Sequence, residues 1–179
     1  DNAARLWNNL LEAGKDQGLE LCGLASRDSL RVEAGLPLYG HEIDGPHNIS
    51  PIEAGYEWTV KFEKDFFIGK DPMLNRSDVH QMKVFRIRMP GEKGVRPVRE
   101  NAPVISDRGN CLGWVLSAAK AQDNQYLLAL LKKDSVRQGN PVAARYPQRT
   151  KKDQTENVKL GEKLEPDIYG TVVSRFARF

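Results

Sequence analysis

Apolar residues recur at helical spacing near the start of the chain. The i, i+3, i+4 pattern predicts an amphipathic helix that Asp1 or Asn2 caps and that Gly14 ends. A short helix with one apolar stripe needs a surface to cover, most simply a β-sheet. The stripe consists of Ala3, Leu6, Trp7, Leu10 and Leu11.

A second helix is expected over Arg27–Ala34, with Ser26 as its N-cap and Gly35 at its end. The loop that follows, residues 35–51, is rich in Gly, Pro, His and Asp. A loop of this length inside a compact domain is more often functional than idle, so we expect it to contact or cover a ligand. Ser50 then caps a predicted one-turn helix.

Residues 56–62 alternate apolar with polar side chains, which predicts a half-buried strand, and residues 66–76 indicate a turn into a short helix. From about residue 77 onward, strand-length runs alternate with turn signals such as Pro90-Gly91, a texture typical of a small antiparallel barrel or sandwich. The polar stretch Gln148–Asp167 is expected to be a loop. The runs are KVFRIRM, APVIS, NCLGWVLSA, QYLLALLK, PVAARYP and YGTVVSRFARF.

Four ionisable residues crowd the second predicted helix among apolar neighbours: Arg27, Asp28, Arg31 and Glu33. Arg27 and Arg31 are one turn apart, which is mildly repulsive unless anions serve both. A half-buried Arg needs partners, because leaving it unpaired is costly. Two explanations remain open for Arg27. Either Asp28, Glu33 or a backbone carbonyl satisfies it, or its fork of donors meets the planar edge or carboxylate of a ligand.

The composition is that of an ordinary globular chain able to bury a sizeable core, with 40% hydrophobic and 28% charged residues among 179. The net charge of +3 hides an asymmetry, since residues 1–72 carry 7 Lys/Arg against 13 Asp/Glu and residues 73–179 carry 20 against 11. Opposite signs can help the two halves dock. Alternatively, the basic half attracts an anionic partner such as an acidic carrier protein, a polycarboxylate or nucleic acid.

Common catalytic and metal motifs are absent from the sequence, which has no Gly-rich phosphate loop and no GxSxG elbow. His41 and His47 share a loop with Glu42 and Asp44, but the spacing is not that of a ligand set, and we expect no metal. Aromatic and basic residues alternate in VFRIR and SRFARF as they do on surfaces that bind single-stranded nucleic acid. Amphipathic strands produce the same texture, and we favour that explanation.

Cys22 and Cys111 are far apart in the sequence, and we expect two free thiols. No apolar run approaches the roughly 20 residues that span a bilayer, and the polar opening lacks the apolar region of a signal peptide. We therefore expect a protein of the bacterial cytoplasm or the mitochondrial matrix. Because the chain starts without Met and ends in strand-like sequence, we also expect a piece of a longer protein.

Two stretches, GLASRDSLRVEAGLPLYGHEID and SPIEAGYEWTVKFEKDFFIGKDPML, resemble the aminomethyltransferase (T-protein) family of the glycine cleavage system and its tetrahydrofolate-dependent relatives. The family pattern there is approximately G-L-x-A-R-D-x-L-R-L-E-A-G-x-x-L-Y-G-x-D-I, followed by P-x-E-A-G-L-x-W-x-V and D-F-x-G-K. The later segment CLGWVLSAAKAQDNQYLLALLKK is similar to a more divergent form of the family's G-x-V-T-S-G-x-x-S-P-x-L-x-x-x-I-A-L-A.

The resemblance implies an α+β chain in two parts. Residues 1–76 would be the C-terminal part of a folate-binding α/β core, and residues 77–179 a small antiparallel β-barrel or jelly-roll-like domain. The implied activity is transfer of a one-carbon unit from an amine donor to tetrahydrofolate. A lipoyl-carrying H-type protein is the implied donor partner, and no membrane partner is expected.

The resemblance also assigns binding residues. Arg27 falls on the Arg of the A-R-D triplet, which contacts substrate and folate in the family. Tyr39 falls on the L-Y-G motif near the same cleft. The family's catalytic Asp and pterin-holding Glu would lie upstream of Asp1, so no catalytic residue is assigned here and the chain alone is expected to be inactive.

Departures from the family pattern leave other activities open. The S-G-x-x-S-P motif becomes Ser117–Gln122, without the Gly or the Ser-Pro, and the C-terminal P-F-Y is not recognisable in VVSRFARF. A folate-dependent demethylase, or the folate domain of a dimethylglycine or sarcosine dehydrogenase, would keep the role of Arg27. A non-catalytic module that binds nucleic acid or protein is the alternative from a different class.

Overall fold

A computed structural model of the chain describes residues 2–43, 47–76, 81–146 and 158–177. Much of the predicted loop Gln148–Asp167 lies outside the described residues. Within them, helices precede strands along the chain. The helices are α1 (Asn2–Gly14), η1 (Lys15–Gln17), α2 (Leu24–Ala34), η2 (Glu57–Thr59) and α3 (Lys70–Arg76), where η marks a 3₁₀ turn. The strands are β1 (Met82–Pro90), β2 (Pro103–Ser106), β3 (Cys111–Ala121), β4 (Asn124–Lys132), β5 (Pro141–Ala144) and β6 (Ile168–Val173).

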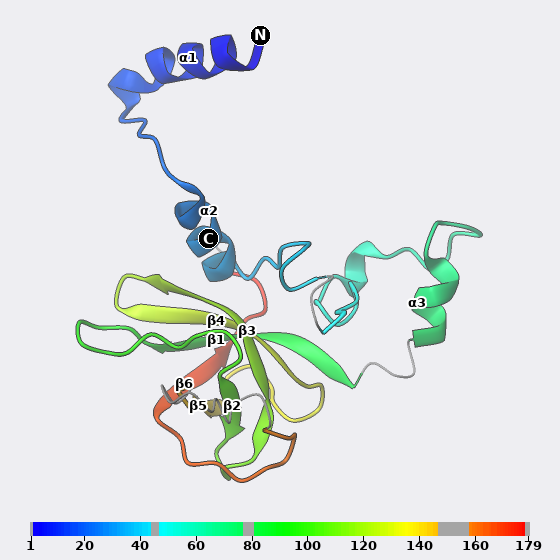
Figure 1. Ribbon diagram of the computed structural model, residues 1–179. Helices are drawn as coiled ribbons and strands as arrows, with labels where there is room; N and C mark the ends of the chain where they lie inside the picture. Colours follow the sequence, from blue (N-terminus) through cyan, green and yellow to red (C-terminus); the bar gives the residue numbers. More distant parts are fainter. Residues whose placement is uncertain (1, 44–46, 77–80, 147–157, 178–179) are drawn as a thin grey trace.

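The strands form a closed antiparallel barrel in the order β1-β4-β3-β2-β5-β6. It closes because β1 pairs with β4 along one edge and with β6 along the other (Figure 1). Each of the strand-length runs in the sequence supplies one strand. The predicted α+β chain with a small antiparallel barrel is therefore confirmed, and the sandwich alternative is not the one adopted.

Strand β4 shows why the barrel needs a cover on its outer face. Leu127, Ala129 and Leu131 belong to the core inside the barrel, whereas Leu128 and Leu130 belong to a second apolar cluster. Successive side chains of a strand point to opposite faces, so an apolar run such as β4 must be buried on both. Helix α2 lies over this outer face (Figure 1). The rest of the second cluster is Val32, Ile49, Ala54, Val84, Leu116 and Ala119.

Helix α1 forms where the pattern predicted, but none of its residues is buried among the described part of the chain. Leu6, Trp7 and Leu10 are 54–59% exposed. Figure 1 shows α1 extending away from the barrel. The expectation that its stripe covers a sheet is therefore wrong within the described residues, because α2 already occupies the outer face of the barrel.

The strand predicted over residues 56–62 is also wrong. Residues Glu57–Thr59 form the 3₁₀ turn η2, in which the Thr59 hydroxyl donates to the Tyr56 carbonyl over 2.7 Å. A strand needs an edge to pair with, and the closed barrel offers none among the described strands. The alternation instead places Phe62 against Phe67, with ring centroids 6.1 Å apart, and leaves Trp58 70% exposed.

The boundaries of α2 differ at one end from those predicted. Its N-cap is Gly23 and makes no side-chain hydrogen bond, so Ser26 lies inside the first turn. The predicted end is confirmed, since Gly35 adopts a left-handed conformation with φ 86°. Ser50 caps as predicted: its N–H donates to Glu53 Oε2 and its Oγ accepts from the Glu53 N–H, although residues 51–55 form turns.

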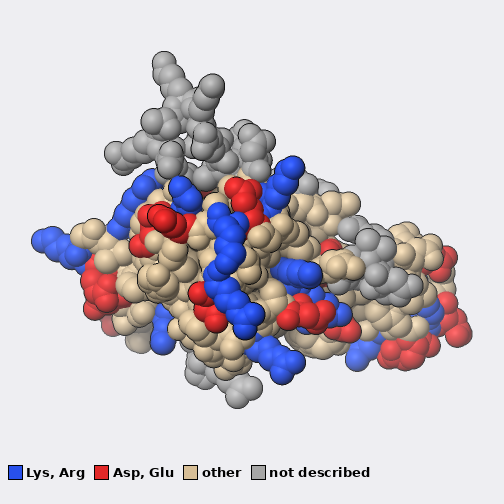
Figure 2. Space-filling model, turned by 90° about the horizontal axis from the view of Figure 1, so that it is seen from below, with Lys and Arg blue, Asp and Glu red and all other residues tan. Residues whose placement is uncertain are grey.

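Cys22 is exposed and Cys111 is buried, and both are free thiols as predicted. Burial raises the pKa of Cys111. Within the described residues, no helix has both the length and the apolar character needed to cross a membrane. Figure 2 shows Lys and Arg side chains across the middle of one face, with Asp and Glu among them. That face carries mixed charge and is not uniformly basic.

Gly113 of β3 provides a test of the barrel packing. Its φ is 151°, and an added Cβ would lie 1.9 Å from the Leu130 carbonyl oxygen of β4. We expect Gly113→Ala to lower the free energy of unfolding by about 3 kcal/mol, because both the backbone conformation and the strand spacing must change. Urea denaturation followed by circular dichroism measures the loss.

Gly139→Ala is the matched control. Gly139 also has a positive φ, 90°, but an added Cβ would meet nothing within 4 Å. The control carries the conformational cost alone, about 1–2 kcal/mol. Equal losses in the two variants would contradict the close approach of β3 to β4.

Candidate functional site

The candidate site is the surface built by α2 and the loop after it. Gly35 ends the helix, and its N–H meets the carbonyl oxygens of Arg31 and Val32. An added Cβ on Gly35 would lie 2.3 Å from the Arg175 carbonyl oxygen, so the backbone at Gly35 packs closely against the C-terminal segment. Gly35 thus turns the chain sharply and lets the following residues pack back against α2.

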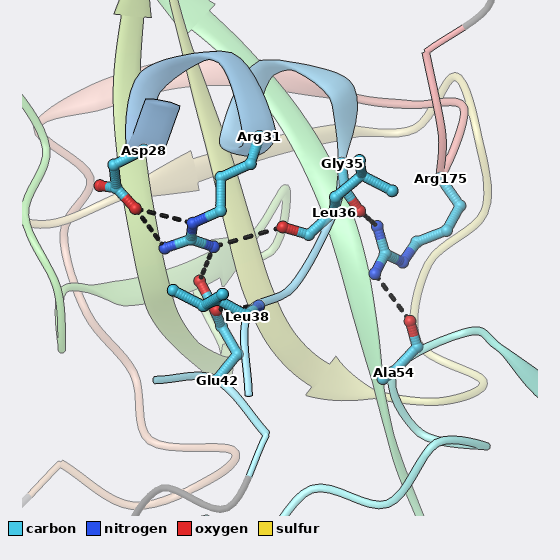
Figure 3. Close-up of polar contacts among 8 residues, drawn as sticks. All are labelled: Asp28, Arg31, Gly35, Leu36, Leu38, Glu42, Ala54 and Arg175. Carbon is cyan, nitrogen blue, oxygen red and sulfur yellow. Dashed lines mark hydrogen bonds and ion pairs between the residues drawn. The ribbon is translucent and has the colours of Figure 1, made fainter. Parts of the chain in front are cut away.

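Arg31 joins α2 to this loop through a buried network (Figure 3). Its Nε donates to Asp28 Oδ1 over 2.7 Å, and its Nη1 donates to Glu42 Oε1 over 2.6 Å and to the Leu36 carbonyl over 3.3 Å. Glu42 Oε2 accepts the Leu38 N–H over 2.8 Å. The Glu42 side chain is fully buried, so this ion pair is shielded from water.

The environment of Glu42 keeps its carboxylate ionised. Burial by itself raises the pKa of Glu42. The nearby Ser117 hydroxyl, the hydrogen bonds from Arg31 and Leu38, and the positive charge of Arg31 together lower the pKa by more than burial raises it. The pKa therefore lies below the ordinary value of 4.5. Glu42 is therefore charged at neutral pH, and its ion pair with Arg31 joins the loop to α2.

Arg175 fastens the C-terminal segment to the same loop. Its Nη1 donates to the Gly35 carbonyl and its Nη2 donates to the Ala54 carbonyl over 2.7 Å (Figure 3). The guanidinium also lies over the Phe176 ring, 4.6 Å from its centroid. Burial lowers the pKa of Arg175 to about 10. Segments far apart in the sequence are therefore joined at Gly35.

The structure places both residues that the sequence assigned to the site on the surface. Arg27 is exposed on α2, and the ion pairs of the described residues use Arg31 instead. Tyr39 is 74% exposed, in a loop that its backbone bridge to Ile43 closes. Of the four charges crowded in the sequence, Arg31 is the buried one. The sequence alone gave no structural role to Glu42 or Arg175. Each of them pairs with a residue that is distant along the chain, Glu42 with Arg31 and Arg175 with Gly35.

A cavity of about 660 Å³ adjoins the first turns of α2. Asp28 of α2, His41 of the loop, Arg99 and Lys120 all line it, so its wall carries both signs of charge. The segment that departs from the family motif, Ser117–Gln122, contributes to this wall through β3. Among the described residues, no group of three His, Cys, Asp or Glu could hold a metal ion, and Asp44 lies outside them.

Replacing Glu42 tests the buried pair. We expect Glu42→Gln to lower the free energy of unfolding by about 3–5 kcal/mol, since Arg31 would keep a buried charge without its partner. Asp28→Asn is the matched control, because Asp28 is 48% exposed and its pair should contribute at most about 1 kcal/mol. Urea denaturation at neutral pH measures the free energy of unfolding of both variants. Similar losses in the two would contradict the larger contribution of the buried Arg31–Glu42 pair.

The same pair predicts a dependence of stability on pH. The folded-state pKa of Glu42 is depressed, so its contribution is present above the ordinary value of 4.5 and is lost as the pH falls through the folded pKa. We expect the wild-type protein to lose more stability than Glu42→Gln on acidification below 4.5. If the free energy of unfolding of the wild type and of Glu42→Gln fell by the same amount below this pH, the role of the Glu42 carboxylate would be refuted.

Comparison with known proteins relates both parts of the chain to one group of enzymes. Residues 1–64 match the family described as the GCVT N-terminal domain. The chain is 53% identical over 78 residues to an aminomethyltransferase of Caldanaerobacter subterraneus, an alignment that covers 44% of the chain and 20% of the relative. It is 36% identical over 141 residues to an aminomethyltransferase of Leptospira interrogans, covering 77% of the chain and 37% of the relative.

A solved structure extends this relation over nearly the whole fold. The glycine cleavage system aminomethyltransferase T of Bartonella henselae superposes with a TM-score of 0.68 at 28% identity. The superposition covers 96% of this chain and 42% of that one, so the chain spans less than half of the relatives' length. In sequence and fold, the chain is similar to a C-terminal part of the glycine cleavage system aminomethyltransferases.

Proposed function

We propose that the protein transfers the one-carbon unit of an aminomethyl group to tetrahydrofolate, while the nitrogen of that group leaves as ammonia. The donor group would be carried by a lipoyl-bearing protein of the H type. The observation that supports this most is Arg27, which stands exposed on α2 at the A-R-D position while the ion pairs beside it use Arg31. The relatives described above are aminomethyltransferases, which supports the same activity.

The exposed residues suit the chemistry of a folate. A guanidinium offers a planar fork of donors to the polar edge of a pterin or to a carboxylate. An exposed tyrosine ring such as Tyr39 offers a face for a flat heterocycle. In this proposal Arg27 binds and orients the folate. The Arg31–Glu42 pair fixes the position of the loop relative to α2.

Tetrahydrofolate would supply the nitrogen that accepts the one-carbon unit. Holding that nitrogen beside the donor carbon supplies much of the rate in such a transfer, because the two reactants no longer have to find one another. An acid–base carboxylate would complete the site. We propose that this group, like the Glu that holds the pterin, belongs to a part of the enzyme upstream of Asp1.

We further propose that residues 1–76 belong to the folate-binding core and residues 77–179 form a separate C-terminal barrel domain. The match to the folate-enzyme family over residues 1–64 and the start of β1 at Met82 both support a boundary between them. The apolar cluster under α2 would then be the contact between the two domains.

The alternatives raised by the sequence carry less support. A demethylase or a dehydrogenase folate domain would also use Arg27, but the names of the relatives favour aminomethyl transfer. A nucleic-acid module would need a basic surface, and the face in Figure 2 mixes both signs. The bacterial cytoplasm is the compartment that the bacterial relatives favour.

Arg27→Ala tests the proposed folate contact. In the whole protein we expect tetrahydrofolate affinity to fall by about 2–4 kcal/mol, because a charge-assisted hydrogen bond is lost. Arg27→Lys should also lose affinity, since a point charge does not replace a planar fork. Isothermal titration calorimetry measures both.

Arg108→Ala is the control, since Arg108 is likewise exposed but lies in the turn before β3. It should bind tetrahydrofolate like the wild type. Thermal unfolding should be unchanged in all three variants, because each replaced side chain is on the surface. Wild-type affinity in Arg27→Ala would end the assignment.

A further inference from the structure

Two adjoining cavities lie at the end of the barrel where β1 begins and where β4 and β6 end. One, of about 330 Å³, is lined by Arg86, Gln138, Ser174 and Ala177. The other, of about 410 Å³, shares Arg86 and Gln138 with the first, so Arg86 stands between the two. Neither cavity has a role in the folate contact proposed above.

The charge around the larger cavity is strongly unbalanced. Its lining includes five cationic side chains and one carboxylate, that of Asp134. Asp134 is exposed to solvent, where its charge is partly screened. The cavity beside α2 does not share this imbalance, since Asp28 and Glu100 accompany its cations. The five cations are Lys83, Arg86, Lys133, Arg137 and Arg175.

Arg86 is the buried member of this set. It is 6% exposed, its Nη1 donates to the Ser174 carbonyl over 3.3 Å, and its guanidinium lies 4.5 Å from the centroid of the Tyr126 ring. Its Nε is enclosed and has no hydrogen-bond acceptor among the described residues. The ion pairs of those residues do not include Arg86. A buried guanidinium without a carboxylate partner is costly to maintain.

The electrostatics agree with this geometry. Burial lowers the pKa of Arg86, while Tyr126 and the Glu33 carboxylate of α2 raise it and Arg88 lowers it. Arg175 experiences the positive charge of Arg86, which adds to the lowering of its pKa by burial. Glu33 therefore offsets the cluster only in part, and an anion would gain from the remaining positive field.

We propose that the two cavities form one binding site for a small multivalent oxoanion, with phosphate groups or clustered carboxylates as its charged ends. Arg86 supplies the positive field at the wall between the cavities. Lys133 and Arg137, both exposed at the rim, donate directly to the anion. Separate cations at the rim favour a ligand with more than one negative group over a single charge.

Calorimetric titration of the whole protein tests this site, with inorganic pyrophosphate and citrate as the two probes. We expect one of them to bind, and which one binds distinguishes phosphate from carboxylate ends. The double variant Lys133→Gln/Arg137→Gln should weaken that binding at least tenfold at equal ionic strength. Because both side chains are exposed, the variant should keep the wild-type circular dichroism spectrum and melting temperature.

Arg99→Gln/Lys120→Gln is the matched control, since it removes the same charge at the cavity beside α2. The control should bind the probe within twofold of the wild type. Equal weakening in both double variants would mean a non-specific charge effect and would overturn the site. Absence of binding by either probe at millimolar concentration would overturn it as well.

Discussion

The ion pair between Arg31 and Glu42 is the interaction on which the candidate site depends. It joins α2 to a loop that has little regular structure of its own, and it does so where water cannot screen the charges. A loop containing Gly35, Pro37 and Gly40 would otherwise have many conformations to choose from. Because the pair is buried, its geometry determines where the exposed face of α2 and Tyr39 stand relative to each other.

The barrel provides the platform for this arrangement. Its outer face carries the apolar cluster on which α2 rests, and Arg175 returns from the end of β6 to bind the carbonyls of Gly35 and Ala54. The loop is thus held from two sides, by α2 through Arg31 and by the C-terminal segment through Arg175. Under the proposed function, the barrel would act indirectly, by supporting the helix and loop that would contact the folate.

The parts of the fold that sequence predicted are those set by local pattern. Alternation, turn residues and the left-handed Gly35 identified the strands and the end of α2. The strand expected near Trp58 failed because alternation indicates a strand only where an edge is free to pair, which is a property of the whole sheet. Glu42 and Arg175 were missed for a similar reason. Their partners lie 11 and 140 residues away along the chain, and no spacing rule reaches that far.

Two buried arginines, Arg31 of α2 and Arg86 of β1, differ in a way that separates stability from binding. Arg31 lies against Asp28 and Glu42, so its charge is matched by carboxylates that the chain itself supplies. Arg86 is equally buried, but among the described residues its contacts are the Ser174 carbonyl and the Tyr126 ring, and the Glu33 carboxylate acts on it through its charge without an ion pair. A fold that can place Glu42 on Arg31 could have placed a carboxylate on Arg86 as well. A guanidinium without a carboxylate partner among the described residues, surrounded by further cations and beside open cavities, is better explained by an anion from outside the chain than by packing.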